Sequence, residues 1–188
     1  MSAPGEIRRQ DLVLDEAGIE QALDRGFCGR LATVGADGAP YCTAMLYVRM
    51  KGELWMHGTK AGGHLRRNLD HEPRVCFLID EPGEIFDYGR FECDSSMSYT
   101  SVMVFGRMRT IDDAASKQRF FETLIAKYRK RGEARPANFF PRLDLITLYA
   151  LAPDRVSGKT IALPAVDQQW PAVDRTKTPE ARPPLTTS

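Results

Sequence analysis

The stretch FCGRLATVGADGAPYCTAMLYVRMKGELWMH, residues 27–57, decides the fold of this 188-residue chain. Apolar and polar residues alternate through residues 27–34 and again through 41–50, which is the period-two pattern of half-buried strands. Between them, Ala36-Asp37-Gly38-Ala39 provides turn residues that tolerate a positive φ. The pattern predicts a hairpin, and Lys51-Gly52 then turns the chain into a third strand over residues 53–57.

The flanking segments predict two peripheral helices. Asp15 is placed to cap a helix that Gly26 ends. Residues 61–70 form a glycine-rich loop that opens into a short helix, which Pro73 breaks. Residues 74–80 alternate as a fourth strand, whereas residues 81–97, with two Gly and one Pro, predict a loop or an irregular strand.

Two strong signals follow in the second half of the chain. Residues 98–111 form the longest strand signal, with apolar residues on both faces, which predicts burial on both faces. Asp112 or Asp113 then caps a helix with an apolar stripe. Residues 143–151 predict a further strand, which residues 156–159 continue beyond the interruption at Pro153.

This order of elements predicts a mainly β fold with helices, in which six antiparallel strands close on themselves and helices plug the ends. Residues 1–10 are expected to be an N-terminal extension and residues 11–160 one domain. Residues 161–188 contain many prolines and one large aromatic residue, Trp170, so we expect a tail or an arm across a partner.

Charge and composition exclude several function classes. The 26 basic and 25 acidic residues nearly cancel, so we expect no nucleic acid and no membrane surface as partners. The N-terminus lacks the apolar run of a secretory signal, which predicts a cytoplasmic protein. The four cysteines, Cys28, Cys42, Cys76 and Cys93, lie far apart in strand-like segments, so ordinary thiols are expected and no metal site.

The segment WMHGTKAGGH, residues 55–64, is the most informative candidate site. Its glycines let backbone amides approach an anion, and Thr59 and Lys60 add donors, so the loop is suited to a phosphate. A plain strand-to-helix connection explains the same composition. The seven-residue spacing of His57, His64 and His71 also allows a metal or heme site, although His57 as a polar group lining a ligand pocket is the preferred hypothesis.

Four pieces, in this order, resemble the pyridoxamine 5′-phosphate oxidase-like superfamily. They are residues 29–41, the His57-Gly58 loop, Asn68 with residues 73–77, and residues 99–107. The resemblance is greatest to the NimA-like, nitroimidazole-resistance branch and covers roughly residues 7–159. It implies a six-stranded Greek-key split β-barrel and a homodimer with two FMN sites at the subunit boundary.

The resemblance also implies which residues hold the flavin. The ring would lie along the second strand, residues 41–46, and the phosphate would lie in the loop after the third strand, residues 57–65. Residues 99–102, a segment with several hydroxyl groups, would approach the ring from the same or the other subunit. One departure is Gly63-His64, where relatives often have Arg or Lys, so that Lys60, Arg66 and Arg67 would replace those cations. The implied cofactor-binding residues are Tyr41, Cys42, Thr43, Ala44, Met45, His57, Gly58, Thr59, Lys60, Gly63, His64, Leu65, Tyr99, Thr100 and Ser101.

These observations favour an FMN-dependent oxidoreductase that acts on a small organic molecule. His57 and Tyr99 are the candidate catalytic proton donors, and packing against the cofactor is the alternative role of each. Two other functions remain open: a carrier of heme or flavin without turnover, and a deazaflavin-dependent reductase. No Gly-x-Ser-x-Gly elbow accompanies the serines of residues 94–101, which argues against covalent hydrolysis.

Overall fold

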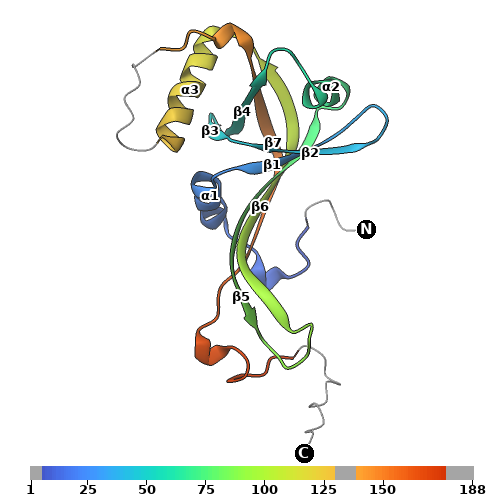
Figure 1. The fold of residues 1–188 in the computed structure, drawn as a ribbon, viewed down its shortest axis with the longest axis vertical. Coiled ribbons are helices and arrows are strands. Elements are labelled where there is room, and N and C mark those ends of the chain that lie inside the picture. The colour runs from blue at the N-terminus through green and yellow to red at the C-terminus, as the bar shows by residue number, and fades with distance from the viewer. Residues whose placement is uncertain (1–5, 130–138, 177–188) are drawn as a thin grey trace, which may run out of the picture.

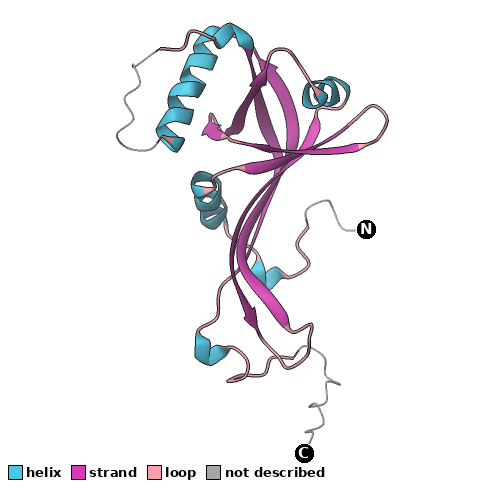
Figure 2. Ribbon diagram, in the orientation of Figure 1, coloured by secondary structure: helices cyan, strands magenta, loops and turns pink. Residues whose placement is uncertain are grey.

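A strongly curved antiparallel sheet with helices around it forms the fold in the computed structural model, which describes residues 6–129 and 139–176 (Figures 1 and 2). None of the helices in these ranges is long and apolar enough to span a membrane. The α-helices are α1 (Glu16–Arg25), α2 (His64–His71) and α3 (Ala114–Tyr128), and the strands are β1 (Gly29–Val34), β2 (Pro40–Met45), β3 (Val48–Met50), β4 (Glu53–Thr59), β5 (Arg74–Asp87), β6 (Ser95–Ile111) and β7 (Ile146–Ile161).

Side-chain caps define where two of the helices begin. The Asp15 carboxylate accepts a hydrogen bond from the Gly18 amide at 2.8 Å, and Asp113 accepts one from the Ser116 amide at 2.8 Å. Each bond satisfies an amide that has no partner inside its helix. Both predicted caps are confirmed, with Asp113 rather than Asp112 at the start of α3, and Gly26 follows the end of α1.

The sheet has seven strands in the order β2-β1-β5-β6-β7-β4-β3, all antiparallel. The predicted class, a mainly antiparallel β fold with helices, is confirmed, but the sheet has seven strands instead of six and does not close on itself. The expected strand over residues 41–50 is two strands, and the two edges of the sheet, β2 and β3, are not paired with each other. The edges are consecutive in the chain, so the sheet curves into a barrel that stays split between them.

Tyr47 makes the break between β2 and β3. Its side chain is fully buried, and its hydroxyl donates to the Leu23 carbonyl of α1 at 2.5 Å. The Tyr128 hydroxyl of α3 donates to the Tyr47 carbonyl at 2.8 Å and accepts from its amide at 3.2 Å. Because these groups of Tyr47 bond to helices, they do not continue a strand ladder.

β5 and β6 continue far beyond the barrel as a long arm, with β7 alongside (Figure 1). A loop or irregular strand was expected over residues 81–97. Instead, β5 continues to Asp87 with one irregularity between Pro82 and Ile85, and β6 already begins at Ser95. Cross-strand hydrogen bonds therefore compensate for the weak local strand signal around Pro82 and Gly83.

The segment after β7 packs on the tip of this arm. The Trp170 amide donates to the Asp87 carbonyl at 3.1 Å, and Arg90 forms an ion pair with Asp174. The short 3-10 helix Val166–Gln168 lies in the same segment. Residues 162–176 of the expected tail thus contact their own hairpin, and residues 177–188 are outside the described part of the chain.

Two hydrophobic clusters stabilise the barrel. The larger lies inside it and includes Leu31, Phe77 and Val104, and the smaller lies between the sheet and α3. On the other face of β6, Met103 and Phe105 are only half-buried. The predicted burial of both faces of this strand is therefore wrong for a single copy of the chain.

Candidate functional site

β2, the strand predicted to lie along a flavin ring, is an edge strand. It pairs with β1 on one side and has no strand partner on the other within the described residues. Tyr41, Thr43 and Met45 are half-buried, while Cys42 and Ala44 on the opposite face are exposed. A free strand edge presents unpaired amide and carbonyl groups, which is what the polar edge of a planar ring requires.

A ring contact brings β2 to the start of α2. Tyr41 and His64 stack with ring centroids 5.6 Å apart and an angle of 22° between their planes. These residues are 23 positions apart in the chain and belong to the two segments expected to hold the ring and the phosphate of one cofactor. The structure therefore brings these two segments together, although the role of each residue remains a prediction.

The loop between β4 and α2 leaves open space around its backbone. Gly62 has φ of +79°, which favours glycine, and Gly63 precedes the helix in an extended conformation without a side-chain cap. A Cβ added at either glycine would meet no atom within 4 Å. In the described chain the amides of residues 64–66 have no acceptor, so the helix start presents three free donors.

Cations surround this loop unevenly. Arg66 is occupied, because its Nε lies 2.9 Å from the Asp70 carboxylate one turn later. Lys60 and Arg67 form no ion pair with any of the described residues. Of the three cations expected to replace the missing Arg or Lys at Gly63-His64, two are available for an anion.

Asn68 connects α2 to the barrel and was not predicted as part of the site. Its side-chain amide donates to the Thr33 hydroxyl at 3.0 Å, and both side chains are buried. The Thr33 hydroxyl in turn lies 3.5 Å from the Tyr41 carbonyl of β2. A polar residue on the apolar side of a short helix was the signal available in the sequence.

His57 lies on the face of β4 that α3 covers. Its imidazole contacts Phe120 and Phe121, with ring centroids 5.6 Å and 5.2 Å away. Met56, the preceding residue, is buried in the larger cluster on the other face. Burial lowers the pKa of His57 below its ordinary value, because a charged imidazolium loses hydration there. The structure thus shows a half-buried imidazole packed against two aromatic rings, where burial disfavours its charged form.

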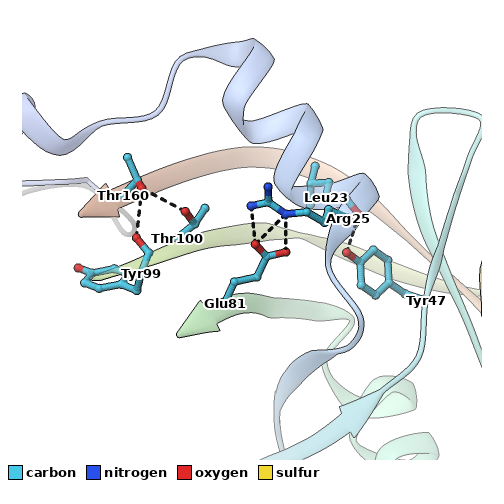
Figure 3. Close-up of polar contacts among 7 residues, drawn as sticks. All are labelled: Leu23, Arg25, Tyr47, Glu81, Tyr99, Thr100 and Thr160. Atoms are coloured by element: carbon cyan, nitrogen blue, oxygen red, sulfur yellow. Dashed lines mark hydrogen bonds and ion pairs between the residues drawn. The ribbon is translucent and has the colours of Figure 1, made fainter. Parts of the chain in front are cut away.

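Tyr99, Thr100 and Ser101 belong to the part of β6 that forms the arm, and Figure 3 shows the first two. The Thr160 hydroxyl of β7 donates to the Tyr99 carbonyl at 3.1 Å and lies 3.1 Å from the Thr100 hydroxyl. Nearby, Arg25 of α1 binds the Glu81 carboxylate of β5, with Nε to Oε2 at 2.9 Å. These contacts hold the arm and α1 in a defined orientation.

The arm residues are remote from β2 within one copy of the chain. Cys42 pairs with Ala32, Ala32 with Cys76, and Cys76 with Phe105, so one row of residues crosses the sheet. Tyr99 precedes Phe105 by six residues in β6, which places it roughly 20 Å from this row at about 3.3 Å per residue. Two strands, β1 and β5, also separate β2 from β6, so we expect that Tyr99 of the same chain does not reach a ring on the free edge of β2.

In the two described ranges, no group of three His, Cys, Asp or Glu residues gathers as a metal site would require. His57 and His64 lie against different partners, Phe121 and Tyr41.

A family model described as pyridoxamine 5′-phosphate oxidase matches residues 15–160. No curated protein matches the chain at a significant level. The matched region contains β1 to β6, all three α-helices and nearly all of β7.

Solved structures with the same fold include three with informative descriptions. The flavocytochrome Anf3 from Azotobacter vinelandii has a TM-score of 0.73 at 17% identity, over 100% of this chain and 94% of that chain. A candidate 5-nitroimidazole antibiotic resistance protein from Bacteroides thetaiotaomicron has a TM-score of 0.65 at 20% identity, and the match covers 79% of this chain and 86% of that chain. The FAD and heme binding protein from Mycobacterium smegmatis has a TM-score of 0.64 at 24% identity, and the match covers 78% of this chain and 71% of that chain.

Proposed function

Because the chain belongs to the pyridoxamine 5′-phosphate oxidase family, a family of flavin-binding split barrels, we propose that it is a flavin-dependent oxidoreductase. It holds the FMN unit in the seam between two copies of the chain and acts on a small organic molecule. When bound, the flavin supplies the electron or hydride transfer, and the protein supplies position, electrostatics and exclusion of water.

The contact between Tyr41 and His64 is the observation that supports this proposal most strongly. It joins a strand with a free edge to a loop with open glycines and free amides. Those two surfaces match the two ends of an FMN unit, the planar ring and the phosphate. A ring along β2 and a phosphate at the start of α2 are therefore within reach of one molecule.

The charges of the loop also fit a phosphate. A hydrogen bond to a charged group contributes about 1.5–3 kcal/mol, so each cation that contacts the phosphate changes affinity about tenfold or more. Lys60 and Arg67 are available for this purpose, and the partial positive charge of the α2 N-terminus adds to them.

The proposal includes a homodimer, because one copy leaves the site incomplete. Tyr99 and Thr100 lie on the arm, far from β2 of the same chain, so they approach a ring there only if they come from a second copy. The half-buried Met103 and Phe105 on the outer face of β6 provide apolar surface for such a partner.

The proton-donor role remains open between His57 and Tyr99. A neutral His57 has one N–H to donate, but it packs against Phe120 and Phe121. The Tyr99 ring has the Lys159 ammonium 5.5 Å from its centroid. Either residue acts only if its donor reaches the substrate in the dimer.

The visible spectrum of the purified protein tests the proposal. A two-banded flavin spectrum, with flavin released by heat and identified by mass, supports it, and light scattering should give twice the mass of one chain. Lys60→Ala should weaken FMN binding about tenfold, while Arg119→Ala, a change at an exposed cation on α3, should not.

Two other spectra would overturn or redirect the proposal. A protein without colour that fails to bind added FMN has no flavin function. A Soret band indicates heme, the second candidate, which the likeness to the flavocytochrome over the whole chain favours. A deazaflavin, the remaining alternative, has a distinct spectrum and mass.

A further inference from the structure

A cavity lies between α3 and the segment that enters β7. Its volume is about 420 Å³, within the range of about 300–1,000 Å³ of small-molecule sites. This volume suits one part of a large cofactor better than the whole molecule. The lining residues are Phe121, Phe139, Phe140, Pro141, Arg142, Leu143 and Ile146.

Aromatic surface and a single charge define the chemistry of this cavity. The rings of Phe121 and Phe140 lie nearly parallel, with centroids 6.1 Å apart and 28° between their planes. Arg142 is the only charged residue among the described residues of the lining, and it forms no ion pair within the described ranges. Such a site suits a flat ring joined to an anionic group.

The cavity borders the candidate phosphate loop. Thr59, the last residue of β4, pairs with Ile146, which lines the cavity. The next amide, that of Lys60, donates to the Leu145 carbonyl at 2.9 Å. The backbone of the loop is therefore bonded directly to the segment that forms the cavity wall.

We propose that the cofactor continues from the phosphate loop into this cavity, so that the site takes a flavin dinucleotide in preference to FMN. The second phosphate binds Arg142, and the purine base stacks on the Phe121 and Phe140 rings. This inference rests on the proposed function and adds the nucleotide half of the cofactor.

Other occupants fit the lining less well. An acidic deazaflavin tail requires several cations, and one is present among the described residues of the lining. Heme requires an axial ligand, and the lining residues that the structure describes include no His, Cys or Met. A purine joined to a phosphate uses both features of the cavity, because a base stacks on aromatic rings and an arginine binds phosphate through two donors.

Fluorescence titration of the flavin-free protein with FAD and with FMN tests the inference. The wild type should bind FAD at least about tenfold more tightly than FMN. Arg142→Ala and Phe140→Ala should each weaken FAD binding about tenfold and change FMN binding less than about twofold. Arg119→Ala, the same change on the other side of α3, should leave both affinities unchanged.

The outcomes separate this inference from the proposed function. Equal affinities for FAD and FMN, or variants that weaken both equally, overturn the dinucleotide site and leave the flavin function standing. Failure to bind either flavin overturns the proposed function itself. Phe140→Leu retains apolar volume if Phe140→Ala fails to fold, and the exposed Arg142 is replaced without loss of buried contacts.

Discussion

Replacing His57 by Ala and by Phe should separate its packing from its protonation. The imidazole contacts two phenylalanine rings at 5.6 Å and 5.2 Å. Each aromatic contact is worth about 0.5–1.5 kcal/mol, so His57→Ala should lower the free energy of unfolding by about 1–3 kcal/mol. His57→Phe keeps both contacts and should cost less than about 1.5 kcal/mol.

The two variants should also differ from the wild type in pH dependence. Burial lowers the pKa of His57 in the folded protein, so the unfolded chain binds the proton more strongly. This contribution to stability is complete above the unfolded pKa of about 6.5 and is lost as the pH falls through the folded pKa. His57→Phe has no such group, so its stability relative to the wild type should rise on acidification.

Urea unfolding measured above and below pH 6.5, about pH 8 and pH 5.5, tests both statements. The reasoning is refuted if His57→Ala unfolds at the wild-type urea midpoint at the higher pH. It is also refuted if the difference between the wild type and His57→Phe is the same at both pH values.

The same variants decide the catalytic role of His57. If the imidazole donates a proton, His57→Phe should lose turnover by about 10²–10⁴-fold while the protein stays folded and binds flavin. Unchanged turnover in His57→Phe would show that the residue only packs against α3.

Three further changes follow from other contacts. Asn68→Ala removes a buried hydrogen bond to Thr33 and should cost about 1–3 kcal/mol in urea unfolding; wild-type stability would show that this bond does not hold α2. Gly63→Ala should change the free energy of unfolding by less than about 0.5 kcal/mol, because the added Cβ meets no atom, but it should weaken flavin binding. Gly62→Ala, at φ +79°, should lower the free energy of unfolding by about 1–2 kcal/mol, and equal costs for the two variants would contradict this reasoning. Arg90→Ala should cost less than about 1 kcal/mol but speed proteolysis of the C-terminal segment, and an unchanged cleavage rate would mean the ion pair does not hold it.

Local signals in the sequence predicted most elements correctly. Asp15 and Asp113 mark helix starts because each carboxylate accepts a hydrogen bond from the free amide three residues later. The turn at Gly38 and the alternation of β1 are equally local. The pieces that resemble the family kept their order, and the family model confirms that assignment.

The sequence predicted two of the segments that meet at the candidate site, and the roles of their residues stay predictions. The sequence pointed to β2 and to the loop before α2, and the stacking of Tyr41 on His64 shows that the two segments meet. Asn68 was part of the family resemblance but was not predicted as a site residue, and nothing in the sequence pointed to the cavity beside Arg142. Both depend on which helix packs on which face of the sheet, and the sequence pattern of one element does not contain that information.

The sequence by itself determined the type of most elements and the family, because caps, turns and alternation act between near neighbours in the chain. Only the tertiary structure decided which elements meet. Tyr47 breaks a continuous strand signal because it bonds to α1 and α3, and β5 extends past Pro82 because β6 pairs with it. Likewise, the position of Tyr99 on the arm, which makes a second copy necessary in the proposed site, comes from the register of β5 and β6.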